Sequence, residues 1–441
     1  MRKLGFPEYA ERECNNMKKI KIAVVGYGNR GQVYADYSLD EPQEVEVVAI
    51  VDCNAYKLDV AKARYGLSDK QVFTTYKEFL ASGLEVDVVI NATMDQVHYE
   101  TAMEILQSKH DMLIEKPIVA KRDELVEIQK AAKENGCQVF VCHVLRYSPF
   151  YKTIKEMLQT GKLGNIVSME MNEHVWIPHY LTSYVRGKWG KETECGSPIL
   201  LAKCCHDMDL IAWLNGKKAK YVSSFGHRSH FVAANKPQDA TENCFDCPHK
   251  DSCKYSAVNL YYKNDTMPFL VWDSLDKPYD QITPAEKEAF LRDNLYGKCA
   301  YDCGGDLMDR QNVLVDFEDG SVASFTLSCG TVRPARYIHI IGTEGEIEGK
   351  LEEDKFIYRL YNKDDVSFTE EVIDLSGKVV NNALYGGHSG GDYGIMHDIV
   401  RYLNGDGVSA SITFLDDSVA SHFLVYAAEE SRKANRVIEL L

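Results

Sequence analysis

The sequence predicts an α/β protein whose first third folds into a parallel sheet flanked by helices. Three observations support this fold class. Short β-branched runs, such as those at residues 18–25 and 44–51, alternate with helical segments up to residue 144. A glycine-rich turn, GYGNRG, directly follows the first run, and an aspartate ends the second. Repeated β-α units of this kind imply parallel strands joined by right-handed crossovers.

The elements follow in a regular order. Strands are expected at 18–25, 44–51, 86–93, 111–114 and 137–144, and helices at 32–37, 97–107 and 123–135. Ligands of such sheets bind outside the carboxyl ends of the strands. The residues that follow each strand are therefore the first candidates for a binding site.

The turn after the first strand has the spacing G-x-G-x-x-G and opens a helix, which is typical of a dinucleotide-binding Rossmann domain. Its glycines let main-chain amides approach a pyrophosphate, and the acid at the end of the second strand can bind a ribose 2′-hydroxyl. The next residues, Cys53 and Asn54, include no arginine for a 2′-phosphate, so we expect NAD rather than NADP. The expected cofactor-binding residues here are Gly26, Gly28, Asn29, Arg30, Gly31 and Asp52.

Two more polar groups follow later strands of the same sheet. Thr93 and His98 lie in NATMDQVH, and Glu115 and Lys116 begin the segment EKP. Because the carboxyl ends of parallel strands meet at one edge, we expect all four residues to contribute to the cofactor site.

Composition restricts the class of partner. The net charge of −16 over 441 residues argues against a nucleic-acid or anionic-membrane surface. There is no apolar run of the ~18 residues that a membrane span needs, and no secretory leader is visible at the N-terminus. We therefore expect a cytoplasmic protein whose 13 cysteines serve as thiols or metal ligands.

The segment LAKCCHDMDL at 201–210 is predicted to belong to a helix that Ser197 caps and Gly216 ends. His206 shares a helical face with Asp209 and is suited to act as a general base. Adjacent cysteines on a helix point about 100° apart, so Cys204 and Cys205 are interpreted as buried filling residues rather than metal ligands. The predicted catalytic residues are Lys116, His206 and Lys203.

Six motifs in this order resemble the Gfo/Idh/MocA family of dehydrogenases, from about Met17 to the C-terminus. They are GYGNRG with Asp52, the T-x-x-x-x-H of Thr93 to His98, EKP at 115–117, R-Y-x-P at 146–149, the helix containing His206, and IIGTEGEIEG at 340–349. The family's motif lysine and histidine fall on Lys116 and His206. The family aspartate four positions before the histidine is replaced by Ala202, which puts a second carboxylate in the proton relay in doubt.

The resemblance implies two domains. After an N-terminal extension (1–16), residues 17–145 form the NAD-binding Rossmann domain and residues 146–441 a substrate-binding and oligomerisation domain. The second domain is expected to be α/β, with a large, mostly antiparallel open sheet whose outer face makes a homodimer or homotetramer. The implied reaction is NAD(P)-dependent oxidation or reduction of a hydroxyl carbon in a sugar, cyclitol or related polyol.

Two alternatives stay open. Some relatives use bound NAD transiently to cleave glycosides through a keto-sugar, and the glycine-rich loop at 386–392 together with Ala202 keeps this possibility. The other is an NAD-binding regulator without turnover.

Three further residues are candidates for binding the substrate. His388 lies in the glycine-rich loop GGHSGGD, and His174 and Trp176 in NEHVW would share a face on a strand. The full expected substrate-binding set is Arg146, His174, Trp176, Asp209 and His388.

A cysteine-rich insertion interrupts the second domain at 230–308. It contains NCFDCPHKDSC and GKCAYDCGG, which together supply the pattern of a closed structural zinc site. An iron–sulfur cluster is the weaker alternative, and Cys303 or His249 could substitute for one ligand. The predicted ligands are Cys244, Cys247, Cys253 and Cys299.

Overall fold

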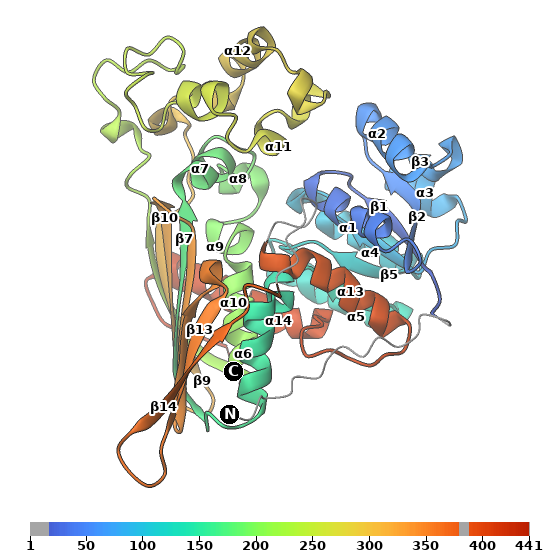
Figure 1. The fold of residues 1–441 in the computed structure, drawn as a ribbon. Coiled ribbons are helices and arrows are strands. Elements are labelled where there is room, and N and C mark those ends of the chain that lie inside the picture. Colours follow the sequence, from blue (N-terminus) through green and yellow to red (C-terminus); the bar gives the residue numbers. More distant parts are fainter. Residues whose placement is uncertain (1–16, 379–387, 441) are drawn as a thin grey trace.

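The computed structural model describes residues 17–378 and 388–440, which form two domains lying side by side (Figure 1). The expected N-terminal extension, 1–16, and residues Gly386 and Gly387 of the glycine-rich loop lie outside this described part. No helix within it combines the length and apolar character needed to cross a membrane.

The first domain contains the predicted parallel sheet, with six strands in the order β3-β2-β1-β4-β5-β6. Five of these strands were expected, and the short strand β3 is the additional one. The β6 strand is shorter than expected because the chain turns into a 3₁₀ segment at Val144–Tyr147, which leads toward the second domain. The strands are β1 (Ile20–Val25), β2 (Val45–Val51), β3 (Val72–Phe73), β4 (Val88–Asn91), β5 (Asp111–Ile114) and β6 (Val139–Val141).

Helices cover both faces of this sheet, as the alternating pattern predicted. Leu58 and Ile395 belong to the apolar core on one face, and Phe79 and Leu125 to the core on the other. The first face is covered by α1 (Asn29–Asp40), α2 (Ala55–Tyr65) and α13 (Gly391–Leu403), and the second by α3 (Tyr76–Ala81), α4 (His98–Gln107) and α5 (Arg122–Asn135).

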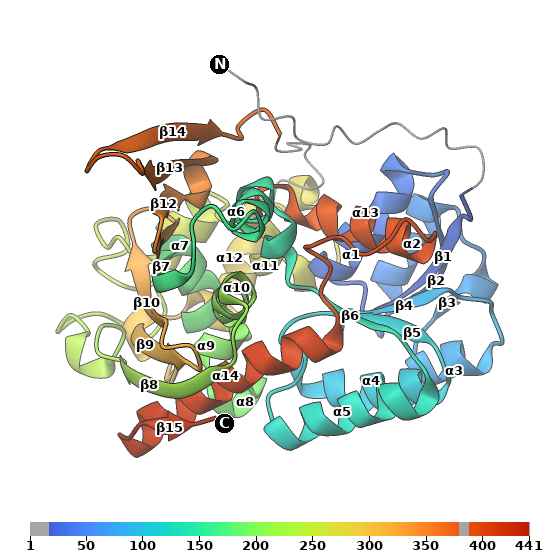
Figure 2. The same ribbon diagram turned by 90° about the horizontal axis from the view of Figure 1, so that it is seen from below.

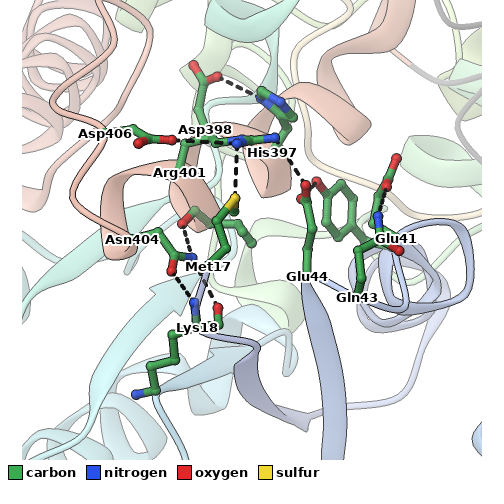
Figure 3. A network of polar contacts seen from close by, with 12 residues as sticks. Met17, Lys18, Glu41, Gln43, Glu44, His397, Asp398, Arg401, Asn404 and Asp406 are labelled. Atoms are coloured by element: carbon green, nitrogen blue, oxygen red, sulfur yellow. Dashed lines mark hydrogen bonds and ion pairs between the residues drawn. The ribbon is translucent and has the colours of Figure 1, made fainter. Parts of the chain in front are cut away.

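Helix α13 comes from the C-terminal part of the chain and docks on the first domain (Figure 3). Arg401 donates to Glu44 at 3.1 Å, and Asn404 accepts from the main-chain amide of Lys18 at 2.8 Å. Phe414 then pairs with Phe140 of β6. The cofactor half of the molecule is therefore completed by a segment that lies nearly 400 residues after its first strand.

The second domain has the expected large sheet, in the order β14-β13-β12-β11-β7-β10-β9-β8-β15. All neighbouring strands in its described part are antiparallel except β7 and β10. The strands are β7 (Ile166–Trp176), β8 (Ala219–His227), β9 (Arg310–Phe317), β10 (Val322–Thr331), β11 (Ala335–Gly342), β12 (Gly345–Lys350), β13 (Lys355–Tyr361), β14 (Phe368–Asp374) and β15 (Ile438–Glu439).

Helices cover only one face of this sheet (Figure 2). They are α6 (Pro149–Gln159), α10 (Cys205–Asn215) and α14 (Leu415–Ala434), whose apolar residues form one core with the inward side chains of the strands. The opposite face, which we call the outer face, carries exposed apolar side chains at Phe225, Leu314, Val322 and Tyr337.

The register of β7 corrects one expectation about the substrate site. His174 and Trp176 do share a face, but it is the outer face, where His174 contacts the ring of Tyr337 at 5.4 Å. Glu173, which directly precedes His174 in sequence, is buried on the inner face. The alternation of side chains along a strand correctly predicted that His174 and Trp176 share a face. It does not determine which face of the sheet is turned toward the cofactor.

The cysteine-rich insertion has a small core of its own around Trp272, beside α11 (Pro268–Val271) and α12 (Pro284–Asp293). It also reaches the first domain. Asn54 donates to Asp276 at 2.7 Å, and Lys57 donates to Asp273 at 2.8 Å. The insertion therefore touches the first turn of α2, next to Asp52.

Arg146 and Asp209 form a buried ion pair between the two domains. The guanidinium group donates twice to the carboxylate, at 2.6 Å each, and the Arg146 and Asp209 side chains are 3% and 0% exposed. Burial alone would raise the pKa of Asp209, but the charge of Arg146 outweighs burial and holds it below its ordinary value. Both residues were expected to bind substrate; their polar atoms instead bind each other and join the end of the first domain to α10.

Removing one partner of this pair should destabilise the fold. We expect Asp209→Ala to lower the free energy of unfolding by about 3–5 kcal/mol, because Arg146 would be left as an uncompensated buried charge. Denaturant unfolding measures this, with Glu134→Ala as the control. Glu134 forms an exposed i,i+4 pair with Lys130, and its loss should change stability by less than about 0.5 kcal/mol. Equal effects of the two changes would contradict the structural role of Asp209.

Candidate active site

The glycine-rich turn after β1 is shaped by close backbone packing. Gly26 has φ +93°, and a Cβ atom there would lie 2.5 Å from the carbonyl oxygen of Ala92. A Cβ atom on Gly31 would lie 2.1 Å from the carbonyl oxygen of Gly26. A Cβ atom on Gly28 would meet nothing within 4 Å. Gly26 and Gly31 are thus fixed by the fold, whereas the space above Gly28 fits the close approach of a pyrophosphate.

Asp52 stands at the carboxyl end of β2, where the sequence placed it. Its carboxylate accepts from the main-chain amides of Tyr27 and Asn54, each at 2.8 Å. Asn54 in turn caps α2 by accepting from the amide of Tyr56. These contacts fix the carboxylate beside the glycine-rich turn, and a carboxylate has further lone pairs for ribose hydroxyls.

The loops after β4 and β5 are held together by His98. Its two ring nitrogens lie 2.9 Å from the carbonyl oxygen of Thr93 and 2.8 Å from that of Pro117. The Thr93 hydroxyl donates to Asn91 at 2.8 Å. His98 was expected to bind cofactor, but both ring nitrogens face main-chain carbonyls. Its contacts position Thr93 and the EKP segment at the sheet edge.

Arg30 connects the glycine-rich turn to two other segments. It forms ion pairs with Glu115 at 2.7 Å and with Asp392, at the start of α13, at 2.8 Å. His388 also contacts Asp392, at 3.1 Å. Burial would raise the pKa of Asp392, but Arg30 and His388 outweigh it and hold that pKa well below its ordinary value. This network brings the C-terminal loop, including His388, to the cofactor edge.

The helix expected from Ser197 to Gly216 is broken into two. A short helix, α9 (Ile199–Ala202), ends before α10 begins at Cys205. Gly216 ends α10 in the left-handed conformation, as predicted. Ser197 does not cap, and its hydroxyl donates to Asp95 at 3.0 Å instead.

The break supplies an acceptor for Lys116. The last carbonyls of a helix have no intrahelical partner, and the Lys116 ammonium donates to the carbonyl oxygen of Ala202 at 3.0 Å. Lys116 therefore meets main chain at the position where the family carries a carboxylate. The ammonium retains two further hydrogens for a ligand.

His206 lies next to this contact. Its side chain is 3% exposed, and neither ring nitrogen has a hydrogen-bond partner among the described residues. The rings of His388 and His143 lie 5.8 and 5.9 Å away, between centroids. Burial, followed by the charge of Lys116, holds the pKa of His206 well below its ordinary value. The imidazole is consequently neutral near pH 7 and able to accept a proton.

The neighbouring cysteines behave as predicted. Cys204 and Cys205 are 0% and 1% exposed and belong to the core of the second domain. Burial raises the pKa of the Cys205 thiol to about 12, so this side chain is an uncharged filling residue rather than a nucleophile.

Lys203 contacts a buried cluster of charged residues, Glu173, Arg336 and Asp207, that the sequence analysis did not identify. It pairs with Glu173 at 3.2 Å, and Arg336 joins Glu173 at 2.8 Å to Asp207 at 2.9 Å. Burial raises the pKa of Asp207 to about 6. Glu173 lies in the same NEHVW segment as His174, and the alternation of β7 was the signal that could have identified it as the inward residue.

Two histidines of the site were also missed. His179, on α7 (Ile177–Tyr180), has Lys203, Lys116, Arg336 and His388 as its charged neighbours. His143 is buried, 3.7 Å from Asp209, and its ring nitrogens have no hydrogen-bond partner within the described chain. His143 lies three positions before Arg146, the first residue of the R-Y-x-P segment. No local sequence pattern indicated that His143 or His179 would lie at the site.

The four predicted metal ligands of the insertion come together in the fold. Cys244, Cys247, Cys253 and Cys299 all line one cavity of about 20 Å³. Over the described ranges, however, no three His, Cys, Asp or Glu side chains are close enough to hold a metal ion as they stand. Cys303 is not among the residues that line this cavity, and its thiol donates to the carbonyl oxygen of Cys299 at 3.2 Å.

Comparison with known proteins identifies both domains. Residues 20–143 match the oxidoreductase family with an NAD-binding Rossmann fold, and residues 155–440 match the C-terminal alpha/beta domain of the same family. Together the two matches cover nearly the whole chain.

Curated relatives are distant. The putative oxidoreductase YteT of Bacillus subtilis is 24% identical over 330 residues, which cover 71% of this chain and 72% of that protein. The scyllo-inositol 2-dehydrogenase (NADP(+)) IolW of the same species is 24% identical over 197 residues, 45% of this chain and 52% of that one.

Solved structures share the fold. The WlbA dehydrogenase of Bordetella pertussis, in complex with NADH and UDP-GlcNAcA, superposes with a TM-score of 0.67 at 18% identity, covering 96% of this chain and 98% of that one. A levoglucosan dehydrogenase with NADH and levoglucosan gives 0.67 at 16% identity, with 96% and 99% covered. The family matches, the glycine-rich turn with Asp52, and the meeting of Lys116 and His206 agree, and the chain is an NAD(P)-dependent dehydrogenase of the Gfo/Idh/MocA oxidoreductase family.

Proposed function

We propose that the enzyme moves a hydride between NAD and a hydroxyl-bearing carbon of a sugar, cyclitol or related polyol. The observation that carries this proposal is His206, a buried imidazole without a partner in the described structure, beside Lys116 at the carboxyl end of β5. Relatives named as acting on inositol and levoglucosan support the substrate class.

Each residue of the site has a separate role in this reaction. The glycine-rich turn and Asp52 would hold NAD, which would supply the hydride acceptor when bound. His206 takes the hydroxyl proton when the alcohol is oxidised and returns it on reduction, so each turnover moves one proton and one hydride. Lys116 donates to the same oxygen and stabilises its developing negative charge. Lys203 remains a candidate for orienting a second hydroxyl, since its ammonium has hydrogens beyond the one that faces Glu173.

A second candidate function is NAD-dependent glycoside cleavage through a transient keto-sugar. It needs a base for the carbon-bound proton beside the ketone, in addition to the base for the hydroxyl. His388 lies 5.8 Å from His206 and offers that second imidazole. Assays with glycosides distinguish the two functions, because cleavage releases an aglycone without net NADH. A regulator without turnover is the least supported reading, since Lys116 and His206 are assembled together.

We further propose that the outer face mediates a homodimer or homotetramer. Phe225, Leu314 and Val322 are 61%, 55% and 46% exposed on one sheet surface, and apolar patches of this kind mark protein interfaces. The partners expected otherwise are a small carbohydrate or polyol, with no nucleic acid or membrane. A cytoplasmic location remains the expectation from the cysteine content.

The insertion is proposed to hold a structural zinc ion. The four cysteines that line one cavity are the support for this proposal. Four thiolates from two short loops form a closed site, which would stabilise a segment with only a small core.

The first prediction concerns the cofactor. The carboxylate of Asp52 should favour ribose hydroxyls and repel a 2′-phosphate, and Lys57, a nearby cation, is engaged by Asp273 of the insertion. Calorimetry should show tighter binding of NAD than of NADP, and Asp52→Ala should reduce the difference. Tighter NADP binding to the unaltered protein would contradict this.

The second prediction concerns proton transfer. His206→Ala should lower kcat by about 10²–10⁴-fold, the usual effect of losing a positioned base, while NAD affinity is kept. The matched control is the double change Cys204→Ala, Cys205→Ala. It should lower stability by roughly 1–3 kcal/mol through lost buried volume and leave the chemistry in place. Steady-state kinetics on a sugar and cyclitol panel decides, and the assignment is wrong if only the cysteine variant loses turnover.

The third prediction concerns the metal. Protein purified without added metal should contain about one zinc per chain, and Cys247→Ser should lose it together with thermal stability of the insertion. Cys137→Ser, at a thiol outside the insertion, serves as the control. Elemental analysis that finds less than half an equivalent of zinc, with unchanged melting after chelation, would end the proposal.

A further inference from the structure

We propose that the sugar or polyol substrate carries a carboxylate group, which a basic pocket beside His206 recognises. We define the basic pocket by His179, Lys116, Lys203, His206 and His388. The inference rests on the proposed function for the identity of the site, but its evidence concerns charge rather than hydride transfer.

The basic pocket is built from five separate segments of the chain. Lys116 follows β5, His179 lies on α7, Lys203 lies in the break between α9 and α10, His206 begins α10, and His388 precedes α13. Lys116 reaches the carbonyl of Ala202, the residue before Lys203, and the His206 and His388 rings are 5.8 Å apart. His179 has Lys203, Lys116 and His388 among its charged neighbours, and His206 has Lys116 and His388.

The charged groups around His179 are basic. Burial lowers the pKa of His179 to about 2, and the charged neighbours that lower it further are Lys203, Lys116, Arg336 and His388. For His206 the corresponding neighbours are again basic, namely Lys116, His388, His143 and Arg336.

The carboxylates that balance these cations lie behind them. Glu173 and Asp207 are 4% and 0% exposed and hold Lys203 and Arg336 from the sheet side. Asp392 is 3% exposed and holds Arg30 and His388 from the base of α13. The side chains that remain reachable are the basic ones, with Lys203 at 14% and His388 at 31%.

The pocket therefore presents donors that neutral sugar hydroxyls cannot fully use. Lys116 and Lys203 each make one polar contact in the described structure, which leaves further N–H groups on two ammonium ions. Charge-assisted hydrogen bonds to an anion are about twice as strong as those between neutral groups. A carboxylate bound here would face two lysines and His179, while the ring hydroxyl to be oxidised faces His206. A phosphate ester shares this chemistry and is the alternative source of the charge.

Ligand-induced melting with NAD present tests the inference without requiring turnover. The probes are matched pairs that differ only at C6, where a hydroxymethyl group is replaced by a carboxylate: glucose with glucuronate and galactose with galacturonate, together with glucose 6-phosphate. A ligand that binds the folded state raises the melting temperature by mass action. We expect each acid to stabilise the protein more than its neutral partner, and glucuronate to exceed glucose 6-phosphate.

Variants locate the effect. Lys203→Met should abolish the advantage of the acids, about a tenfold or greater loss in apparent affinity for glucuronate, whereas Lys203→Arg should keep most of it. Lys130→Met, on the exposed surface of α5, is the control and should change nothing.

The inference is overturned if no acid stabilises more than its neutral partner, or if the difference survives in Lys203→Met. If glucose 6-phosphate raises the melting temperature more than glucuronate does, the proposed carboxylate is wrong and the substrate carries a phosphate ester instead. NADH formation on neutral sugars with no acid preference would leave the dehydrogenase proposal standing. Acid-selective binding with no NADH from any ligand would overturn only the dehydrogenase proposal.

Discussion

The buried ion pair of Arg146 and Asp209 determines how the two halves of this enzyme meet. Arg146 follows the last strand of the cofactor domain, and Asp209 lies in the first half of α10. Two 2.6 Å contacts in an apolar core fix the direction of that helix. Since His206 lies one turn before Asp209, the pair also fixes the position of the His206 imidazole, the proposed general base.

The contacts of Lys116 follow from the break between α9 and α10. The break at Lys203 and Cys204 frees the carbonyl of Ala202, and Lys116 binds to that carbonyl. A main-chain oxygen does not titrate, so the missing family aspartate is replaced by an acceptor of constant charge. The carboxylates that do lie nearby, Glu173, Asp207 and Asp392, are buried and pair with Lys203, Arg336 and His388.

The second constraint is the return of the C-terminal segment. Helix α13 packs on the first domain through Arg401 and Asn404 (Figure 3) and carries Asp392 to Arg30. This contact sets His388 beside His206. The insertion also reaches this region, because its Asp273 and Asp276 accept from Lys57 of α2 and from Asn54, the residue before that helix. Two segments that are remote in sequence, the C-terminal segment and the insertion, thus contact the cofactor domain near this edge.

The sequence by itself determined the features that depend on local pattern. The parallel sheet, the turn with Gly26 and Gly31, Asp52 at the end of β2 and Gly216 at the end of α10 were predicted because strand periodicity, backbone sterics and helix caps act over a few residues. Tertiary structure alone decided which face of β7 turns inward, which placed Glu173 rather than His174 at the site. It also paired Arg146 with Asp209, broke the helix at Lys203, and brought His388 to His206. Those outcomes depend on which buried charges find partners across the interface between domains, and no short stretch of sequence contains both partners.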